Sequence, residues 1–255
     1  MSKLQTELHR LYLPKEAAER QARTTESALI DQDGMVRAMV MELARPADWE
    51  ALDLVWRGVQ SDLELPAPAI AVSGTDGFQL WFSLAEPVAV GKAQAFLESL
   101  RLRYWADIAS KRLRLLPAAD PEQPGQARHA DLVPGPKPGT GYWSAFVSPD
   151  LAPMFAETPW MDIAPGDDGQ AAVLRRLVSI SPTAFAVALK QLQAPAPGTP
   201  AEEAPSASSS EAGQPGDPAE TASGQLSPRQ FLLQVMNDER APLALRVEAA
   251  KALLP

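Results

Sequence analysis

A basic run in the middle of the chain has the residue types that bind phosphate. Arg112 and Arg114 are separated by one residue, and Lys137 lies further along the chain. Because side chains alternate along a strand, Arg112 and Arg114 would share one face and could contact phosphate groups if Lys137 lay nearby. The alternative, which is the commoner arrangement, is a solvated helix end followed by a strand with outward charges.

Carboxylates that could hold a metal ion are sparse. Glu42 ends a predicted strand, but the position two residues on, which would share its strand face, is Ala44. A single carboxylate binds a hydrated divalent ion only weakly. Asp162, Asp167 and Asp168 surround a Pro-Gly pair without the spacing of a calcium-binding loop, so we interpret them as a loop that leads into a helix. The sequence therefore predicts no metal site.

Composition excludes several other kinds of chemistry. The chain has no cysteine, which removes disulfides, thiolate zinc sites and cysteine nucleophiles. Its two histidines leave almost nothing for a histidine-rich metal site or a Ser-His-Asp triad, and the glycine motifs of nucleotide-binding loops do not occur. A formal net charge of −9 argues against coating a nucleic acid by bulk charge. We therefore expect no cofactor.

The elements that must position these residues fall within residues 1–193, which hold all six Trp and all three Tyr. Hydrophobic periodicity predicts helices over 3–13, 46–60, 90–102, 170–180 and 182–192. It predicts strands over 35–43, 69–73, 78–84, 112–116 and 142–147, with a hairpin turn over 74–77. This order predicts an α+β domain with a mixed or antiparallel sheet, in which a central hairpin is flanked by helices.

Two further segments follow that domain. Residues 194–226 contain no aromatic residue, Lys or Arg, so they cannot bury enough apolar surface to offset the entropy of ordering and are predicted to be a disordered linker. Residues 227–255 have the pattern of a helical hairpin that is too small to be stable alone. Neither a secretory signal nor an apolar run long enough to span a bilayer is visible, so we expect a cytoplasmic protein without a membrane partner.

The predicted hairpin carries a family resemblance. Ser73 and Gly74 end its first strand, and its second strand begins Gly77-Phe78-Gln79-Leu80-Trp81. This segment resembles the central hairpin of the archaeo-eukaryotic primase superfamily, in which Ser-Gly precedes a Gly-aromatic-His-Leu-Trp pattern. Residues 131–137 (DLVPGPK) are similar to a late element of those proteins that contains Pro-Gly and a Lys. The resemblance covers about residues 35–139.

That resemblance implies phosphoryl transfer with metal ions held by two acids on one strand face, and a His that contacts a nucleotide phosphate. In this chain the second acid position is Ala44 and the His position is Gln79, which leaves Glu42 and Gln79 as the weak catalytic candidates. We therefore expect a catalytically degenerate primase-like domain that binds DNA weakly. Its expected nucleic-acid-binding residues are Ser73, Gly74, Gln79, Arg112, Arg114 and Lys137.

The C-terminal segment carries a second resemblance, at Phe231, Leu232, Met236, Asn237, Asp238, Arg246, Ala249, Ala250, Lys251 and Pro255. These positions resemble the terminal helical element of small terminase-type proteins of phages and prophages. The resemblance implies a mobile-element setting. It also implies that this helical element docks a partner protein, through Phe231, Leu232, Met236 and Arg246.

Three hypotheses about function follow. The first is the degenerate primase-like domain, acting in the DNA metabolism of a phage, prophage or plasmid through nucleic-acid or protein binding. The second is an active divergent primase or nucleotidyltransferase, in which Glu42 holds Mg²⁺ together with an acid from elsewhere, such as Asp76 or Asp131. The third is an adaptor protein without a nucleic-acid role. Two carboxylates that converge on one point would favour the second hypothesis.

Overall fold

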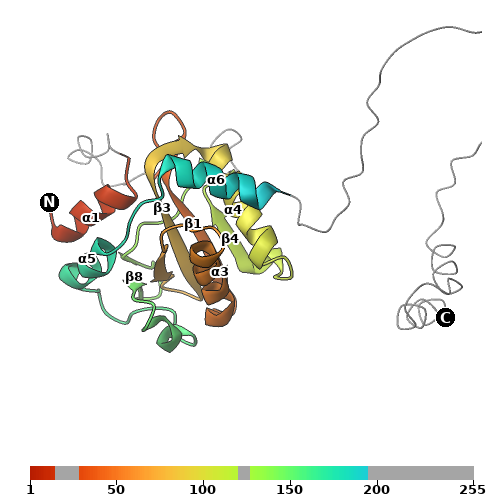
Figure 1. The fold of residues 1–255 in the computed structure, drawn as a ribbon. Coiled ribbons are helices and arrows are strands. Elements are labelled where there is room, and N and C mark those ends of the chain that lie inside the picture. The colour runs from red at the N-terminus through yellow and green to blue at the C-terminus, as the bar shows by residue number, and fades with distance from the viewer. Residues whose placement is uncertain (15–28, 120–126, 195–255) are drawn as a thin grey trace, which may run out of the picture. The chain divides into compact units, whose positions relative to one another are not determined.

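The computed structural model describes residues 1–14, 29–119 and 127–194 (Figure 1). The α-helices among them are α1 (Lys3–Leu11), α3 (Trp49–Ser61), α4 (Val90–Tyr104), α5 (Asp167–Arg175) and α6 (Pro182–Gln193), and the 3-10 helices are η1 (Ser110–Arg112) and η2 (Ala152–Phe155). The strands are β1 (Met35–Ala44), β2 (Ala69–Val72), β3 (Gly77–Ala89), β4 (Leu113–Leu116), β5 (Ala118–Ala119), β6 (Ala127–Arg128), β7 (Gly135–Pro136) and β8 (Trp143–Val147). None of these helices is long and apolar enough to cross a membrane.

The predicted linker and C-terminal helical hairpin lie outside the described residues from position 195 on. The proposed partner-binding residues Phe231, Leu232, Met236 and Arg246 belong to that part of the chain. Their docking role therefore stays a prediction of the sequence.

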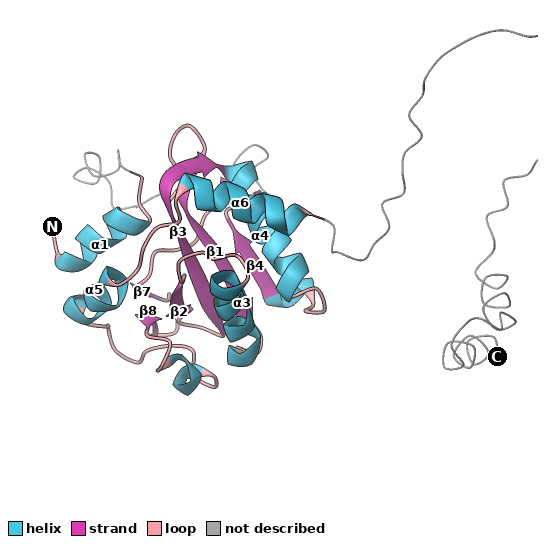
Figure 2. Ribbon diagram, in the orientation of Figure 1, coloured by secondary structure: helices cyan, strands magenta, loops and turns pink. Residues whose placement is uncertain are grey.

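One antiparallel sheet organises the described residues. Its six strands run in the order β4-β1-β3-β2-β8-β7, and every neighbouring pair is antiparallel, while β5 and β6 form a separate pair (Figure 2). Helix α3 connects β1 to β2 across β3, and α4 connects β3 to β4 across β1, which is the split βαβ topology. The predicted α+β class is confirmed, and the sheet is antiparallel rather than mixed.

Local sequence signals explain where most helices begin. Asp48 Oδ1 accepts a hydrogen bond from the Ala51 backbone N–H at the start of α3 (3.0 Å), which satisfies one of the unpaired donors of the first turn. Ser181 does the same for α6, which has Pro182 at its first position. The prediction for α5 was wrong, because the helix spans Asp167–Arg175 instead of 170–180. Two acids in its first turn favour that earlier start, since they lie at the positive end of the helix dipole.

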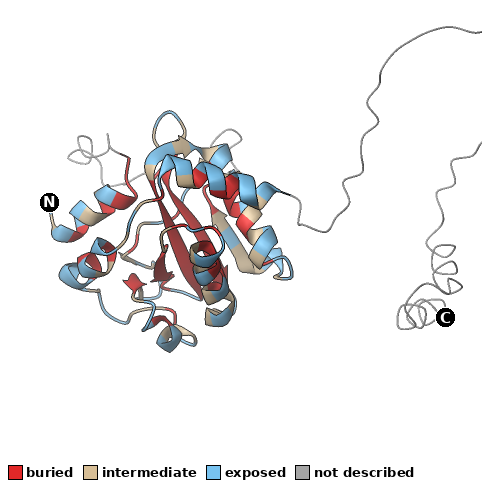
Figure 3. Ribbon diagram, viewed as in Figure 1, coloured by how far each residue is buried: buried red, intermediate tan, exposed pale blue. Residues whose placement is uncertain are grey.

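Helices α3, α4 and α6 cover one face of the sheet (Figure 1). Strand residues at alternate positions, such as Met41, Leu80 and Phe82, pack there against Val55 of α3 and Phe96 of α4. Figure 3 shows the central strands as the most buried part of the domain. Because nine of the ten residues of β1 are buried, the sheet must be covered on its second face as well.

The second face is covered by α1, by α5 and by the loop between β6 and β7, which contributes Ala130 and Val133. An aromatic cluster forms its centre. The ring centroid of Trp81 lies 5.2 Å from that of Tyr12 and 5.8 Å from that of Phe146, in edge-to-face geometry. Gln170 fixes α5 to β8, because its side-chain amide accepts from the Phe146 N–H (2.7 Å) and donates to the Phe146 carbonyl (3.0 Å).

Two arginines attach the helices of this second face. The side chain of Arg37 is buried beside a register shift in the β1–β3 ladder, and burial lowers its pKa. It donates to the carbonyls of Leu84, His9, Leu13 and Arg10, three of which lie at or just beyond the C-terminal end of α1. Arg10 in turn donates to the carbonyls of Leu174 (2.9 Å) and Leu177 (3.0 Å) at the end of α5. Arg37 therefore satisfies carbonyls at the end of α1, whereas Arg10 adds a second hydrogen bond to the Leu174 carbonyl, which also accepts from the Leu177 N–H.

The Tyr12→Phe substitution is expected to raise the free energy of unfolding by about 1 kcal/mol. The Tyr12 hydroxyl is fully buried and has no hydrogen-bond partner among the residues that the structure describes, and its burial raises the pKa of the phenol above the usual range. Removing the hydroxyl removes an uncompensated desolvation cost while the aromatic contacts stay. Urea denaturation of the two proteins measures the change. Tyr142→Phe, at a half-exposed ring, is the control and should be neutral; a loss of stability in Tyr12→Phe would contradict the prediction.

Candidate functional site

The catalytic candidates Glu42 and Gln79 lie in one row that crosses five strands. The Cα partners in this row are Arg114 of β4, Glu42 of β1, Gln79 of β3, Ala71 of β2 and Phe146 of β8. All of these residues are therefore on the same face of the sheet, opposite α3, α4 and α6. The antiparallel pairing of β1 with β3 and β4 places Glu42 between Gln79 and Arg114.

A hydrogen-bonded network joins the polar members of the row. Gln79 Nε2 donates to Glu42 Oε2 at 2.7 Å, and Trp81 Nε1 donates to Gln79 Oε1 at 2.8 Å. Arg114 Nη1 lies 3.7 Å from Glu42 Oε1. Glu42 and Gln79 are only 5% and 6% exposed, so both oxygens of the carboxylate face protein partners. Neither side chain is exposed to solvent.

This arrangement makes Glu42 a structural acid in a satisfied network. The neighbouring face position on β1 is Ala44, as the sequence indicated, and Ala44 pairs with Gly77. Asp76 forms an ion pair with Arg45, and Asp131 forms one with Lys137. Within the described part of the chain, no group of three or more His, Cys, Asp and Glu residues is placed to share a metal ion.

Ser73 and Gly74 shape the hairpin turn. Ser73 Oγ accepts from the backbone N–H groups of Thr75 (3.2 Å) and Gly77 (3.0 Å), so its hydroxyl is used by the turn itself. Gly74 has a φ of +80°, and a Cβ there would come within 2.7 Å of Lys137 Cγ and of the Ser144 backbone nitrogen. Only glycine fits this position. Gly77, at the start of β3, does not have a positive φ.

Lys137 is not available as an open phosphate contact. Its side chain is only 17% exposed, and its Nζ lies 3.0 Å from Asp131 Oδ2. It follows β7, at the opposite edge of the sheet from β4. The expected patch of Arg112, Arg114 and Lys137 is therefore not formed.

Arg112 is likewise displaced from its predicted position. It ends η1 and precedes β4, so it does not share a strand face with Arg114. Its Nε and Nη2 donate to the carbonyls of Ala44 (3.3 Å) and Pro46 (2.9 Å). These bonds tie η1 to the end of β1.

A different basic cluster lies at this end of β1 and β4, and sequence reasoning missed its Arg45. Arg45 Nη2 donates to the Lys111 carbonyl at 3.0 Å, which brings two more cations to Arg112 and Arg114. We call Arg45, Lys111, Arg112 and Arg114 the basic edge. Arg45 has a φ of +55°, which is uncommon for a residue other than glycine, and its side chain is 65% exposed. The signal available in the sequence was only that each arginine flanks a strand end.

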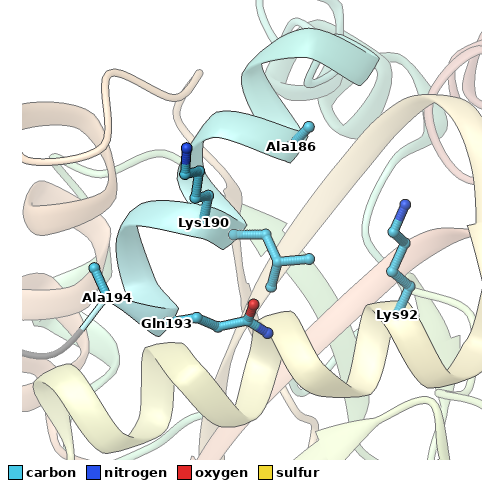
Figure 4. Close-up of a pocket in the computed structure, with 6 residues that line it drawn as sticks. Lys92, Ala186, Lys190, Gln193 and Ala194 are labelled. Atoms are coloured by element: carbon cyan, nitrogen blue, oxygen red, sulfur yellow. The ribbon is translucent and has the colours of Figure 1, made fainter. Parts of the chain in front are cut away.

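A shallow groove of about 450 Å³ lies apart from this site, between α4 and α6 (Figure 4). Its lining residues are Lys92, Ala186, Leu189, Lys190, Gln193 and Ala194. These helices cover the face of the sheet opposite Glu42, and none of the candidate residues lines the groove.

Comparison with known protein families finds no family that matches this chain, and comparison with the curated proteins finds no match. The function is therefore inferred from the geometry of the network and of the basic edge.

Proposed function

We propose that this chain is a catalytically degenerate, primase-like protein that binds nucleic acid weakly through its basic edge. It would act in the cytoplasm, in the DNA metabolism of a phage, prophage or plasmid. The observation that carries the proposal is the long separation between the edge arginines and their acidic neighbours. The ion pairs Arg45–Asp76, Arg112–Asp48 and Arg114–Glu42 have N···O distances of 3.7, 3.8 and 3.7 Å.

Those distances exceed the range of a hydrogen bond, so these carboxylates do not occupy the guanidinium donors of Arg45 and Arg114, whereas Arg112 donates to the carbonyls of Ala44 and Pro46. Elsewhere the arginine ion pairs range from 2.6 Å in Arg57–Asp53 and Arg101–Glu98 to 3.8 Å in Arg175–Glu7, so the basic edge is distinguished by having its long pairs close together. A guanidinium with open donors suits a phosphate, which it can bind with two hydrogen bonds. The side chains of Arg45 and Arg114 are 65% and 62% exposed, so a phosphate backbone can reach both.

The degenerate character is supported by the partners of Glu42. Metal-assisted phosphoryl transfer needs carboxylate oxygens that are free to bind the ion. Gln79 and Arg114 face the two oxygens of Glu42, and the next position on that strand face is Ala44. The second hypothesis, in which Asp76 or Asp131 joins Glu42 around Mg²⁺, is disfavoured because both acids have cationic partners elsewhere.

The double substitution Arg45→Ala and Arg114→Ala is expected to lower affinity for nucleic acid at least fivefold, and equally for every base sequence. Phosphate contacts position a nucleic acid without reading its bases. The measurement is fluorescence anisotropy with labelled single- and double-stranded oligonucleotides at about 50 mM salt. For about three phosphate contacts, log affinity should fall against log salt with a slope of about −2 to −3.

The matched control is Arg57→Ala with Arg101→Ala, which removes two arginines whose carboxylates already bind them closely. This double variant should bind nucleic acid with unchanged affinity. Equal losses in both double variants would point to bulk charge and contradict the proposal, as would the absence of binding at low salt.

Nucleotide incorporation with Mg²⁺ or Mn²⁺ tests the degenerate character separately. We expect no primer synthesis from the full chain. Robust incorporation that Glu42→Gln abolishes would overturn this part of the proposal and favour the active enzyme, whatever the binding result.

A further inference from the structure

Three large hydrophobic side chains in η2 and the segments that flank it are exposed. Leu151, Met154 and Ile163 are 51%, 75% and 73% exposed. Three of the eight exposed large hydrophobics among the described residues thus fall between positions 151 and 163. We call this segment, the green region at the bottom of Figure 1, the 151–163 surface. Single exposed apolar residues are ordinary, whereas a concentration of them marks an interaction surface.

The same segment carries one ring of an aromatic pair. The rings of Tyr142 and Trp160 are stacked, with centroids 4.8 Å apart and an interplanar angle of 22°, and both residues are partly buried. Tyrosine and tryptophan are enriched among the residues that dominate binding energies at protein interfaces, and methionine is enriched at interfaces more generally. The pair therefore supplies large, stiff contact area, and Met154 supplies a flexible side chain from the same segment.

The backbone that carries Trp160 is fixed on both sides. The Pro159 carbonyl accepts a hydrogen bond from the Gly74 N–H at 3.0 Å. Met161 and Trp143 exchange both backbone hydrogen bonds, at 2.9 and 3.0 Å. The surface is therefore preorganised, which reduces the entropy that a partner must offset on binding.

Charge decides what kind of partner fits. Between Lys137 and Arg175 the chain has no Lys or Arg, and it has five exposed acids, of which Asp168 is paired with Lys3: Asp150, Glu157, Asp162, Asp167 and Asp168. A nucleic acid would be repelled here. A partner segment with apolar side chains and several Lys or Arg would bury its apolar side chains on this surface and pair its cations with the acids. An arginine of that segment could also stack on the aromatic pair.

We propose that the 151–163 surface docks a basic, amphipathic segment of a partner protein. The 151–163 segment bonds to β8 and to the β2–β3 turn, whereas the basic edge lies along β1 and β4 and meets that turn at Asp76. The two surfaces therefore use different residues, and a nucleic acid and a protein would contact different side chains. The inference does not depend on the proposed nucleic-acid binding.

The test uses the full chain and a labelled synthetic peptide of Lys and Leu, about 18 residues long, patterned as an amphipathic helix. A second peptide with Glu in place of Lys is the charge control. We expect the Lys peptide to bind at physiological salt and the Glu peptide not to bind. Met154→Ser with Ile163→Ser should weaken binding of the Lys peptide about tenfold, and so should Trp160→Ala. Met154 and Ile163 are so exposed that their replacement should not affect folding.

Leu54→Ser with Val187→Ser is the matched control, because these side chains are 55% and 59% exposed on α3 and α6. It should leave the affinity unchanged. Binding of both peptides, or equal binding by all variants, would overturn the proposal and indicate attraction by net charge alone. Self-association that Met154→Ser with Ile163→Ser abolishes would also overturn it, because the occupant would then be a second copy of the chain.

Discussion

Replacing Arg37 with methionine is expected to lower the free energy of unfolding by about 3 to 5 kcal/mol. The guanidinium makes four hydrogen bonds to backbone carbonyls, and Arg37 is only 5% exposed. Methionine fills similar space but donates no hydrogen bond, so it leaves these acceptors without a donor. Unpaired buried acceptors cost about 1 to 3 kcal/mol each, and those nearest the surface regain part of this by binding water.

Urea denaturation measures this change, and Arg57→Met is the matched control. Arg57 forms a single ion pair with Asp53, four residues before it on α3, and its side chain is 72% exposed. Such pairs contribute about 0.3 to 0.5 kcal/mol. The loss of stability in Arg37→Lys should lie between the losses in Arg37→Met and Arg57→Met, because lysine keeps the charge but cannot reach four carbonyls. A loss below about 1 kcal/mol in Arg37→Met would contradict the assigned role.

The second large effect is expected in the network around Glu42. Gln79→Leu should cost about 2 to 4 kcal/mol, because it leaves a buried carboxylate with one distant cation and the Trp81 N–H without an acceptor. Glu42→Leu should lower the free energy of unfolding by about 1 to 3 kcal/mol, because it leaves the Gln79 Nε2 donor without its acceptor. The double variant removes both partners, so its cost should be about 1 to 3 kcal/mol less than the sum.

A double-mutant cycle by urea denaturation measures this coupling. The control cycle combines Gln79→Leu with Glu98→Leu. Glu98 is paired with Arg101 on α4, which covers the other face of the sheet. Its two effects should add within about 0.5 kcal/mol. Additive behaviour of Glu42→Leu and Gln79→Leu would show that the two side chains do not stabilise each other.

Much of the fold could be predicted from the sequence because its signals are local. The hairpin turn over 74–77 and the start of α6 each depend on a few neighbouring residues, whereas α3 begins at Trp49, three residues after its predicted start. The limits of α5 and β4 were less accurate. Arg112 was assigned to a strand on alternation alone, whereas its backbone N–H bonds to the Ala109 carbonyl and closes a 3-10 turn before β4 begins.

The candidate site could be predicted only in part, because its geometry depends on pairing between distant segments. Glu42 and Gln79 were both singled out, but they are 37 residues apart, and their hydrogen bond requires the register between β1 and β3. The basic edge could not be predicted for the same reason, because it too depends on pairing between distant strands. Arg45 and Lys111 are neighbours only because β4 pairs with β1, and a single sequence gives no indication of that pairing.

The arginine caps on α1 and α5 have a consequence for access to the second face of the sheet. Opening α1 would break the bonds of Arg37 to His9, Arg10 and Leu13 and, at the same time, those of Arg10 to α5. Helix α1 therefore cannot fray from the sheet as an independent unit, and the aromatic cluster around Trp81 is uncovered only by sub-global unfolding. Amide hydrogens beneath α1 should accordingly exchange with solvent at rates close to those of the core strands. A ligand that binds this face of the sheet in the folded chain must therefore approach from the edges of the sheet.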